Sequence, residues 1–211
     1  TRDVVLPAQN FVSTLGAKLQ SRHPRLEFDT DCNGRGSIKK IHTDRRFQKD
    51  RPPLKTYLAM IFWEGPLKEK KSNACYRVEV APGKLLLGAG LHYLDAKLLK
   101  KYREAVDDET KGSALADDAL GLSGLPGYEL GTLHFKRVPR GFTGDHPRAT
   151  LLKHNAIHVS TAMPIPEEFL SADFVEVCDV HFERMAPLFV WCADFLRWAV
   201  VEAGPSAGPD V

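Results

Sequence analysis

Apolar side chains recur at helical spacing at both ends of the chain. Near the start, apolar positions between residues 4 and 19 repeat every three or four residues, which predicts an amphipathic helix ending near residues 21–26. Between residues 174 and 199 a second apolar stripe predicts a long C-terminal amphipathic helix. Ser171 is the predicted N-cap of this helix, and Pro187 predicts a kink or a break inside it.

The middle of the chain carries strand patterns. Residues 56–63, "TYLAMIFW", are apolar on both faces, which predicts a central strand of a sheet. Residues 74–80 alternate between apolar and polar, and the turn signal "APG" predicts that they pair in a hairpin with residues 84–93. Residues 156–163 predict a further strand.

Shorter patterns complete the set of predicted elements. Residues 95–105 predict a helix with Asp95 as its N-cap, and residues 148–154 predict a short helix. Residues 111–126 are rich in Ala, Gly, Ser and Leu and predict a short helix followed by a loop. Residues 37–43 and 131–138 are two weaker strand predictions. The elements together predict an α+β fold in which the sheet is mostly antiparallel and helices flank it.

Composition sets the class of protein. Of the 211 residues, 43% are hydrophobic and 27% charged, which is typical of a globular protein with a core of its own. We therefore predict one domain over residues 1–203, followed by a disordered tail over residues 204–211. No apolar run reaches the roughly 20 residues that span a bilayer, so no membrane association is expected. The four cysteines contain no CxxC pair and are interpreted as free thiols of a cytoplasmic protein.

Charge is distributed unevenly along the chain, although the net charge is only +2. Residues 33–71 contain 11 basic and 4 acidic side chains, a net of +7, whereas residues 167–211 contain 2 basic and 9 acidic side chains, a net of −7. The first region is a candidate anion site and the second an acidic surface. An equally simple interpretation is that the two regions face each other and neutralise their charges.

Three motifs resemble known sites and fail on inspection. Residues 29–40 begin like a calcium-binding loop, but Lys40 stands where a bidentate Glu is needed. The "GAG" at Gly88–Gly90 lacks the third glycine of a dinucleotide site, and it is better explained by a bulge or the close approach of another backbone. His154 and His158 are four residues apart but cross from a helix end into a strand. We therefore expect neither a metal nor a cofactor.

Basic residues gather in two proline-stiffened segments, residues 44–56 and 136–147. The candidate anion-binding side chains are Arg46, Lys49, Arg51, Lys55, Lys136, Arg137 and Arg140, and Arg45 lies among them. Arginine forks bind phosphate or carboxylate bidentately, and lysine adds a point charge. The alternative is that Asp44, Asp50 and Asp145 pair with these cations and only hold the loops in place.

Three stretches resemble the family known as domain of unknown function 2461. They are "DRRFQKDRPPLKTY", "GAGLHY" and "KRVPRGFTGDHPRATLL", which occur in the order and spacing of that family and cover nearly the whole chain. Gln48 and Leu54 depart from the usual family residues, and the family's opening segment with a Trp-Phe pair has no counterpart in this sequence. The resemblance implies an α+β fold with a curved sheet and flanking helices, and it implies no activity.

Three functions compete at this point. The leading hypothesis is the binding of a small phosphate- or carboxylate-bearing ligand between the two basic segments. The second is an enzyme in which Asp44 or His146 transfers protons beside the cations. The third is nucleic-acid binding, with Phe47 and Phe142 stacking on bases, but the near-neutral net charge and the acidic C-terminal region argue against it. The oligomeric state stays open.

Overall fold

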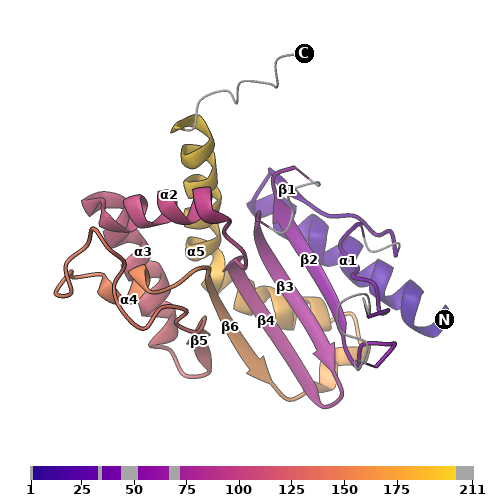
Figure 1. Cartoon of the computed structure of the whole chain (residues 1–211). Helices are drawn as coiled ribbons and strands as arrows, with labels where there is room; N and C mark the ends of the chain where they lie inside the picture. Colours follow the sequence, from indigo (N-terminus) through magenta and orange to yellow (C-terminus); the bar gives the residue numbers. More distant parts are fainter. Residues whose placement is uncertain (1, 33–34, 44–51, 67–71, 203–211) are drawn as a thin grey trace.

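A curved sheet with two long helices on one face organises the chain (Figure 1). The computed structural model describes residues 2–32, 35–43, 52–66 and 72–202. The helices are α1 (Arg2–Arg22), α2 (Ala96–Asp107), α3 (Glu109–Ser123), α4 (Ala149–Leu152), the 3-10 helix η2 (Glu167–Leu170) and α5 (Phe174–Glu202). The strands are β1 (Leu26–Glu27), β2 (Leu58–Glu64), β3 (Ala74–Ala81), β4 (Lys84–Leu91), β5 (Tyr128–Leu130) and β6 (Ile157–Met163).

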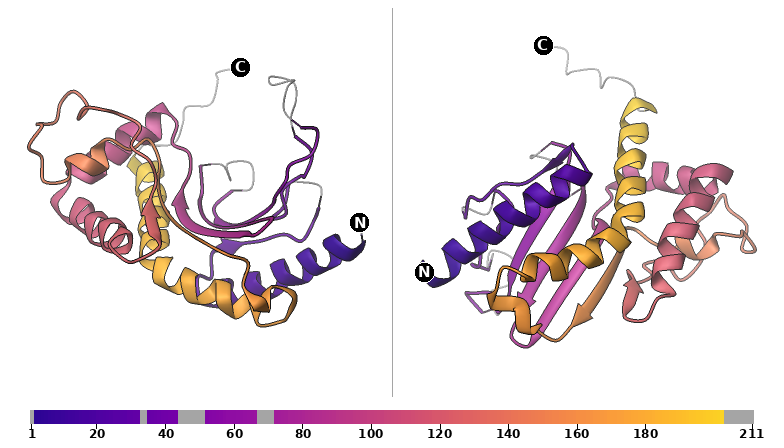
Figure 2. Two further views of the ribbon diagram at one scale, coloured as in Figure 1. Left: turned by 90° about the horizontal axis from the view of Figure 1, so that it is seen from below. Right: turned by 180° about the vertical axis from the view of Figure 1, so that it is seen from behind.

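The six strands form one sheet in the order β1-β2-β3-β4-β6-β5, and every neighbouring pair is antiparallel. Figure 2 shows that the sheet is curved and that α1 and the first half of α5 cover one of its faces. The predicted α+β fold, with an antiparallel sheet and a long C-terminal helix, is confirmed.

The core lies between the sheet and α5. Phe62, Tyr76, Ala89 and Val159 occupy paired positions across β2, β3, β4 and β6, so their side chains share the face that α5 covers. Phe189 of α5 stacks on Tyr76 with ring centroids 4.4 Å apart. The Tyr76 hydroxyl and His23 Nε2 are 3.0 Å apart, so this buried phenol keeps a hydrogen bond.

Helix α5 connects most of the molecule. Its buried Asp179 accepts hydrogen bonds from both terminal nitrogens of Arg22, each at 3.1 Å, and also pairs with Lys18, which fixes α1 against α5. The helix is continuous through Pro187 but changes direction along its length, as expected where a proline removes an internal hydrogen bond (Figure 2). None of the described helices combines the length and the apolarity that a membrane span requires.

Four local predictions need correction. Residues 131–138 are not a strand, because pairing with β6 ends at Leu130 and the chain then turns to bond with Lys153. Residues 111–126 are mostly helical, since Asp108 caps a 15-residue α3 by accepting from the Lys111 amide. Ser171 ends η2 and does not cap α5, which begins at Phe174. Residues 37–43 form only isolated bridges, because Ile38 pairs with Met60 and His42 with Leu54.

Strand β2 is buried on both faces, as its sequence predicts, but it lies second from the edge of the sheet. Its second buried face is explained by a small cluster of Ile61, Trp63 and Cys75 on the side away from α5. The segment at Ser37–Lys39 runs along its outer edge, where the Ile61 amide donates to the Ser37 carbonyl. Burial on both faces therefore does not require a central position.

Candidate functional site

The first basic segment connects the two arms of a hairpin beside β2. The Thr43 amide donates to the Pro53 carbonyl at 2.9 Å, and the Lys55 amide donates to the Ile41 carbonyl at 2.7 Å. The candidates between these arms lie outside the described residues; they are Asp44, Arg45, Arg46, Lys49, Asp50 and Arg51. Lys55 is the member of this cluster that the structure places.

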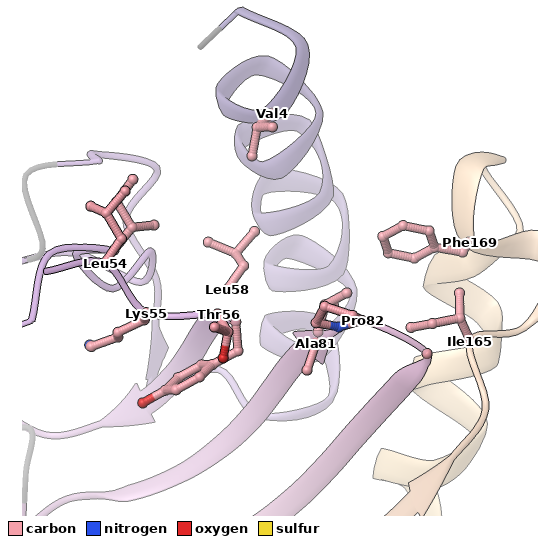
Figure 3. Close-up of a pocket in the computed structure, with 13 residues that line it drawn as sticks. Val4, Leu54, Lys55, Thr56, Leu58, Ala81, Pro82, Ile165 and Phe169 are labelled. Carbon is pink, nitrogen blue, oxygen red and sulfur yellow. The ribbon is translucent and has the colours of Figure 1, made fainter. Parts of the chain in front are cut away.

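Lys55 lines an apolar pocket of about 530 Å³ at the start of β2 (Figure 3). Its Nζ lies 5.6 Å from the centroid of the Tyr57 ring, a cation–π contact. The same pocket is lined by Pro82 and Gly83 of the β3–β4 turn and by Ile165 after β6. Lys55 is thus near the end of the sheet where β3 turns into β4.

The second basic segment belongs to a long loop between β5 and α4. The loop starts where the Gly131 amide donates to the His158 carbonyl, and the amides of His134 and Phe135 donate to the Lys153 carbonyl. The Phe135 ring lies 5.0 Å from the Arg103 guanidinium of α2. Further along, Lys136, Arg137 and Arg140 are exposed.

Two side chains hold the far end of this loop against the α2–α3 joint. Arg148 donates from Nε to the Val106 carbonyl at 2.6 Å and from Nη2 to the Asp107 carbonyl at 2.9 Å. His146 has both ring nitrogens engaged: Nε2 is 3.1 Å from an Asp107 carboxylate oxygen, and Nδ1 accepts from the Arg148 amide. These contacts identify His146 as an anchor of the loop and give no support to the predicted acid–base role.

The described lysine and arginine side chains of both basic segments form no ion pair with an acidic side chain. Within the described part of the chain, Lys55, Lys136, Arg137 and Arg140 form no ion pair, as is also true of other exposed cations such as Lys84 and Arg25. The Asp145 carboxylate accepts a hydrogen bond from the Thr143 side chain, the main reason that its pKa lies below the usual value. Asp145 therefore stabilises its own turn and does not neutralise the neighbouring arginines.

The described residues do not bring the two basic segments together. Strand pairing places the start of β2 beside the end of β3, whereas the loop that carries Arg140 leaves the sheet next to the start of β6. The pocket around Lys55 includes no described residue of 136–147. Convergence of the segments depends on Arg46, Lys49 and Arg51, and it stays a prediction.

A further group of residues meets on the sheet face away from α5, and it includes Arg77 and Ser160, which the sequence analysis did not single out. Arg77, Gly88 and Ser160 occupy paired positions on β3, β4 and β6, and the neighbouring row contains Gly90 and His158. Gly90 has a φ of +129°, and a Cβ there would lie 2.3 Å from the Ile157 carbonyl oxygen. The predicted close backbone approach at "GAG" is confirmed. Gly88 and Gly90 of β4 therefore lie between Arg77 of β3 and His158 of β6, and they place no side chain between them.

The polar side chains on this face are partly buried; Arg77 pairs through Nη2 with Glu79, and one nitrogen of each of Arg77, His92 and His158 is buried without a described hydrogen-bond partner. The rings of His92 and His158 lie 4.4 Å apart, and His92 Nε2, His158 Nδ1 and Arg77 Nε have no hydrogen-bond partner among the described residues. Burial, with smaller effects of His158 and Arg77, lowers the pKa of His92 to about 3. Burial likewise lowers the pKa of His158. Both imidazoles are therefore neutral at neutral pH.

Nucleophilic and metal chemistry find little support among the described residues. All four cysteines are unpaired, and burial raises the pKa of the Cys75 thiol to about 11, so that it stays protonated. No group of three or more potential metal-ligating side chains occurs in the part of the chain that the structure describes. The grouping of Arg77, His92 and His158 depends on strand register. The only sequence signal for it was the alternation in β3, which places Arg77 on the other face of the strand from Tyr76 and Val78.

Residues 2–191 match the family described as "Conserved hypothetical protein (DUF2461)". The match covers nine tenths of the chain and all three motifs that carried the resemblance. No curated protein and no solved structure matches the chain.

Proposed function

We propose that this chain, which belongs to the DUF2461 family of conserved hypothetical proteins, binds a small anionic ligand through its two basic segments. The ligand bears phosphate or carboxylate groups. The observation that supports the proposal is the absence of ion pairs at Lys55, Lys136, Arg137 and Arg140 among the described residues, combined with the use of Asp145 within its own turn. Like charges so close along one loop repel each other, and a bound anion relieves that repulsion.

The anchoring of the loop favours binding. Arg148 and His146 fix its end, and Lys153 fixes its beginning, so the segment with Lys136, Arg137 and Arg140 is held before a ligand arrives. A loop that is already ordered loses less conformational entropy on binding. The anchors use backbone carbonyls and one aspartate, which leaves the exposed cations available for phosphate or carboxylate oxygens.

Pyrophosphate and citrate titrations by calorimetry at low salt test the proposal. Arg140→Ala should weaken binding of at least one of these probes by about tenfold, the cost of losing a charge-assisted hydrogen bond. Arg25→Ala, at an exposed arginine in the connection between α1 and β1, is the matched control and should change nothing. The melting temperature of Arg140→Ala without ligand should equal that of the wild type.

Three results would count against the proposal. One is the absence of binding by both probes, and another is equal binding by Arg140→Ala and wild type. The third is a large loss of thermal stability in Arg140→Ala, which would show that Arg140 holds the loop in place. Tight binding of a single-stranded oligonucleotide that falls steeply with salt would instead favour the nucleic-acid hypothesis.

A further inference from the structure

An open apolar groove runs across the end of the molecule where β3 turns into β4. It consists of the pocket around Lys55 and a second pocket of about 540 Å³ between α1, β2 and η2. Val4, Leu58, Val80 and Phe169 line both pockets, so the two pockets lie side by side. Each volume falls within the roughly 300–1,000 Å³ that is usual for small-molecule sites.

The walls of the groove are apolar and partly exposed. Leu170 is 93% exposed and Val4 58% exposed, although both line the second pocket. Soluble chains rarely leave contiguous apolar surface in water unless something binds there. The side chains of Val4, Leu58 and Phe169 come from three different elements and surround the same space in Figure 3.

Among the described residues that line the groove, Lys55 is the only one with a charged side chain. Figure 3 shows it at the margin, on the side opposite Phe169, with its amine extending outward. No described carboxylate pairs with it, and Tyr57 is its one described partner through the cation–π contact. An apolar groove with a single described cation at its margin complements a molecule with an apolar chain and an anionic head.

We propose that this groove binds an amphiphilic carboxylate, a fatty-acid-like molecule whose chain lies between α1, β2 and η2 and whose head meets Lys55. A protein partner would place varied side chains against a surface that offers only one charge, whereas an acyl chain fits a continuous apolar wall. The inference rests on the proposed function in one respect, that Lys55 faces an anionic group. It does not involve the loop with Arg140.

Calorimetric titration with octanoate, decanoate and dodecanoate below their micellar concentrations tests the inference. The dissociation constant should fall by up to about fourfold for each added methylene, because each buried methylene contributes ~0.8 kcal/mol. Val4→Glu places a negative charge at the junction of the two pockets on an already exposed position, and it should weaken dodecanoate binding at least tenfold. Leu6→Glu, on the same helix, exposed and outside the lining, should not.

The head group has its own pair of variants. Lys55→Met should weaken dodecanoate binding about fivefold at low salt, the upper range for an exposed ion pair, and Lys84→Met on the adjacent turn should not. Dodecyltrimethylammonium should bind the wild type more weakly than dodecanoate does. In Arg140→Ala dodecanoate binding should persist, so a failure of the anion site at the loop is distinguishable from a failure of this one.

Several outcomes overturn the inference. The inference fails if dodecanoate does not bind, or if Val4→Glu and Leu6→Glu change its dissociation constant equally. It also fails if dodecyltrimethylammonium binds as tightly as dodecanoate, or if Arg140→Ala abolishes dodecanoate binding. One further outcome is a dimer in light scattering that Val4→Glu dissociates and Leu6→Glu does not. That result would mean that a second copy of the chain covers the groove.

Discussion

Gly90 is constrained both by its own backbone angle and by the neighbouring strand. Its φ of +129° is disfavoured for any side chain, and a Cβ would meet the Ile157 carbonyl oxygen at 2.3 Å. Gly90→Ala should therefore lower the free energy of unfolding by about 2–4 kcal/mol. Gly121→Ala is the opposite case, because nothing lies within 4 Å of its added Cβ inside α3, and it should stabilise by about 0.5 kcal/mol. Urea unfolding followed by circular dichroism measures both, and equal effects would contradict the argument.

His92 should make the protein less stable in mild acid. Burial lowers its pKa in the folded protein to about 3, while an unfolded histidine titrates near 6.5. Below about pH 6.5 the unfolded chain binds a proton that the folded chain does not, so stability falls as pH falls until about pH 3. From pH 7.5 to pH 5.5 the loss from His92 should be about 1 kcal/mol.

Urea unfolding at pH 7.5 and pH 5.5 checks this dependence. His92→Gln cannot titrate and should lose less stability over that interval than the wild type does. His42→Gln, at an exposed position in the hairpin arm, should keep the wild-type pH dependence. An unchanged dependence in His92→Gln would mean that His92 is accessible to protons in the folded protein.

Among single residues, the sequence predicted those that act within their own element, such as a helix cap. It missed those whose role depends on contacts between distant elements. The Asp95 N-cap is confirmed, since its carboxylate accepts from the Leu98 amide at 2.8 Å. The contact between the His92 and His158 rings was not foreseen, because it requires β4 and β6 to be neighbours although 65 residues lie between Leu91 and Ile157 in the sequence. Chemistry that depends on the pairing of distant strands cannot be read from spacing.

At the scale of elements, periodicity predicted the strands of the β3–β4 hairpin and both long helices well. Each has a repeated pattern that burial enforces over many residues. The long loop after β5 was predicted as a strand because "GTLHFKRV" contains apolar side chains at roughly alternate positions. Its backbone bonds instead with Lys153, and of these apolar side chains Phe135 contacts Arg103 while Leu133 is exposed.

Arg148 is the side chain that joins this loop to α2 and α3. It donates to the carbonyls of Val106 and Asp107 at the end of α2, where helical carbonyls have no partner of their own. Arg148→Met should lower the free energy of unfolding by about 2 kcal/mol, since charge-assisted hydrogen bonds are lost and carbonyls are left unsatisfied. It should also weaken pyrophosphate binding, because the loop becomes less ordered.

Arg140→Ala is the matched control for the stability effect, because it removes an exposed arginine from the same loop. Thermal unfolding should separate the two variants, with a lower melting temperature only in Arg148→Met. If both variants unfolded like the wild type, the α2–α3 joint would be held by packing alone.

On the scale of the whole molecule, the two oppositely charged regions do not neutralise each other through described ion pairs. The acidic Glu176 and Asp179 of α5 pair with Lys18 and Arg22 of α1. The one described ion pair between residues 33–71 and 167–211 has reversed polarity, since Arg197 is the cation and Glu64 the anion. The unpaired positive charge of the basic segments is consistent with an external anion, and contacts of this kind depend on tertiary structure that the sequence does not reveal.

The central position of α5 predicts that the protein unfolds in one cooperative step. This helix contacts α1, β3 and β4 on one side and α2 and α3 on the other, so neither part keeps its core when α5 leaves. Trp63 reports on the β2 side, while Trp198, beside Lys101 and Lys111, reports on α2 and α3. Urea midpoints from circular dichroism and from fluorescence should coincide within Trp63→Phe and within the double variant Trp191→Phe/Trp198→Phe, which also removes Trp191 beside Lys111 of α3. Separate midpoints in either variant would mean that the two parts are stabilised independently and that α5 is divided between them at Pro187.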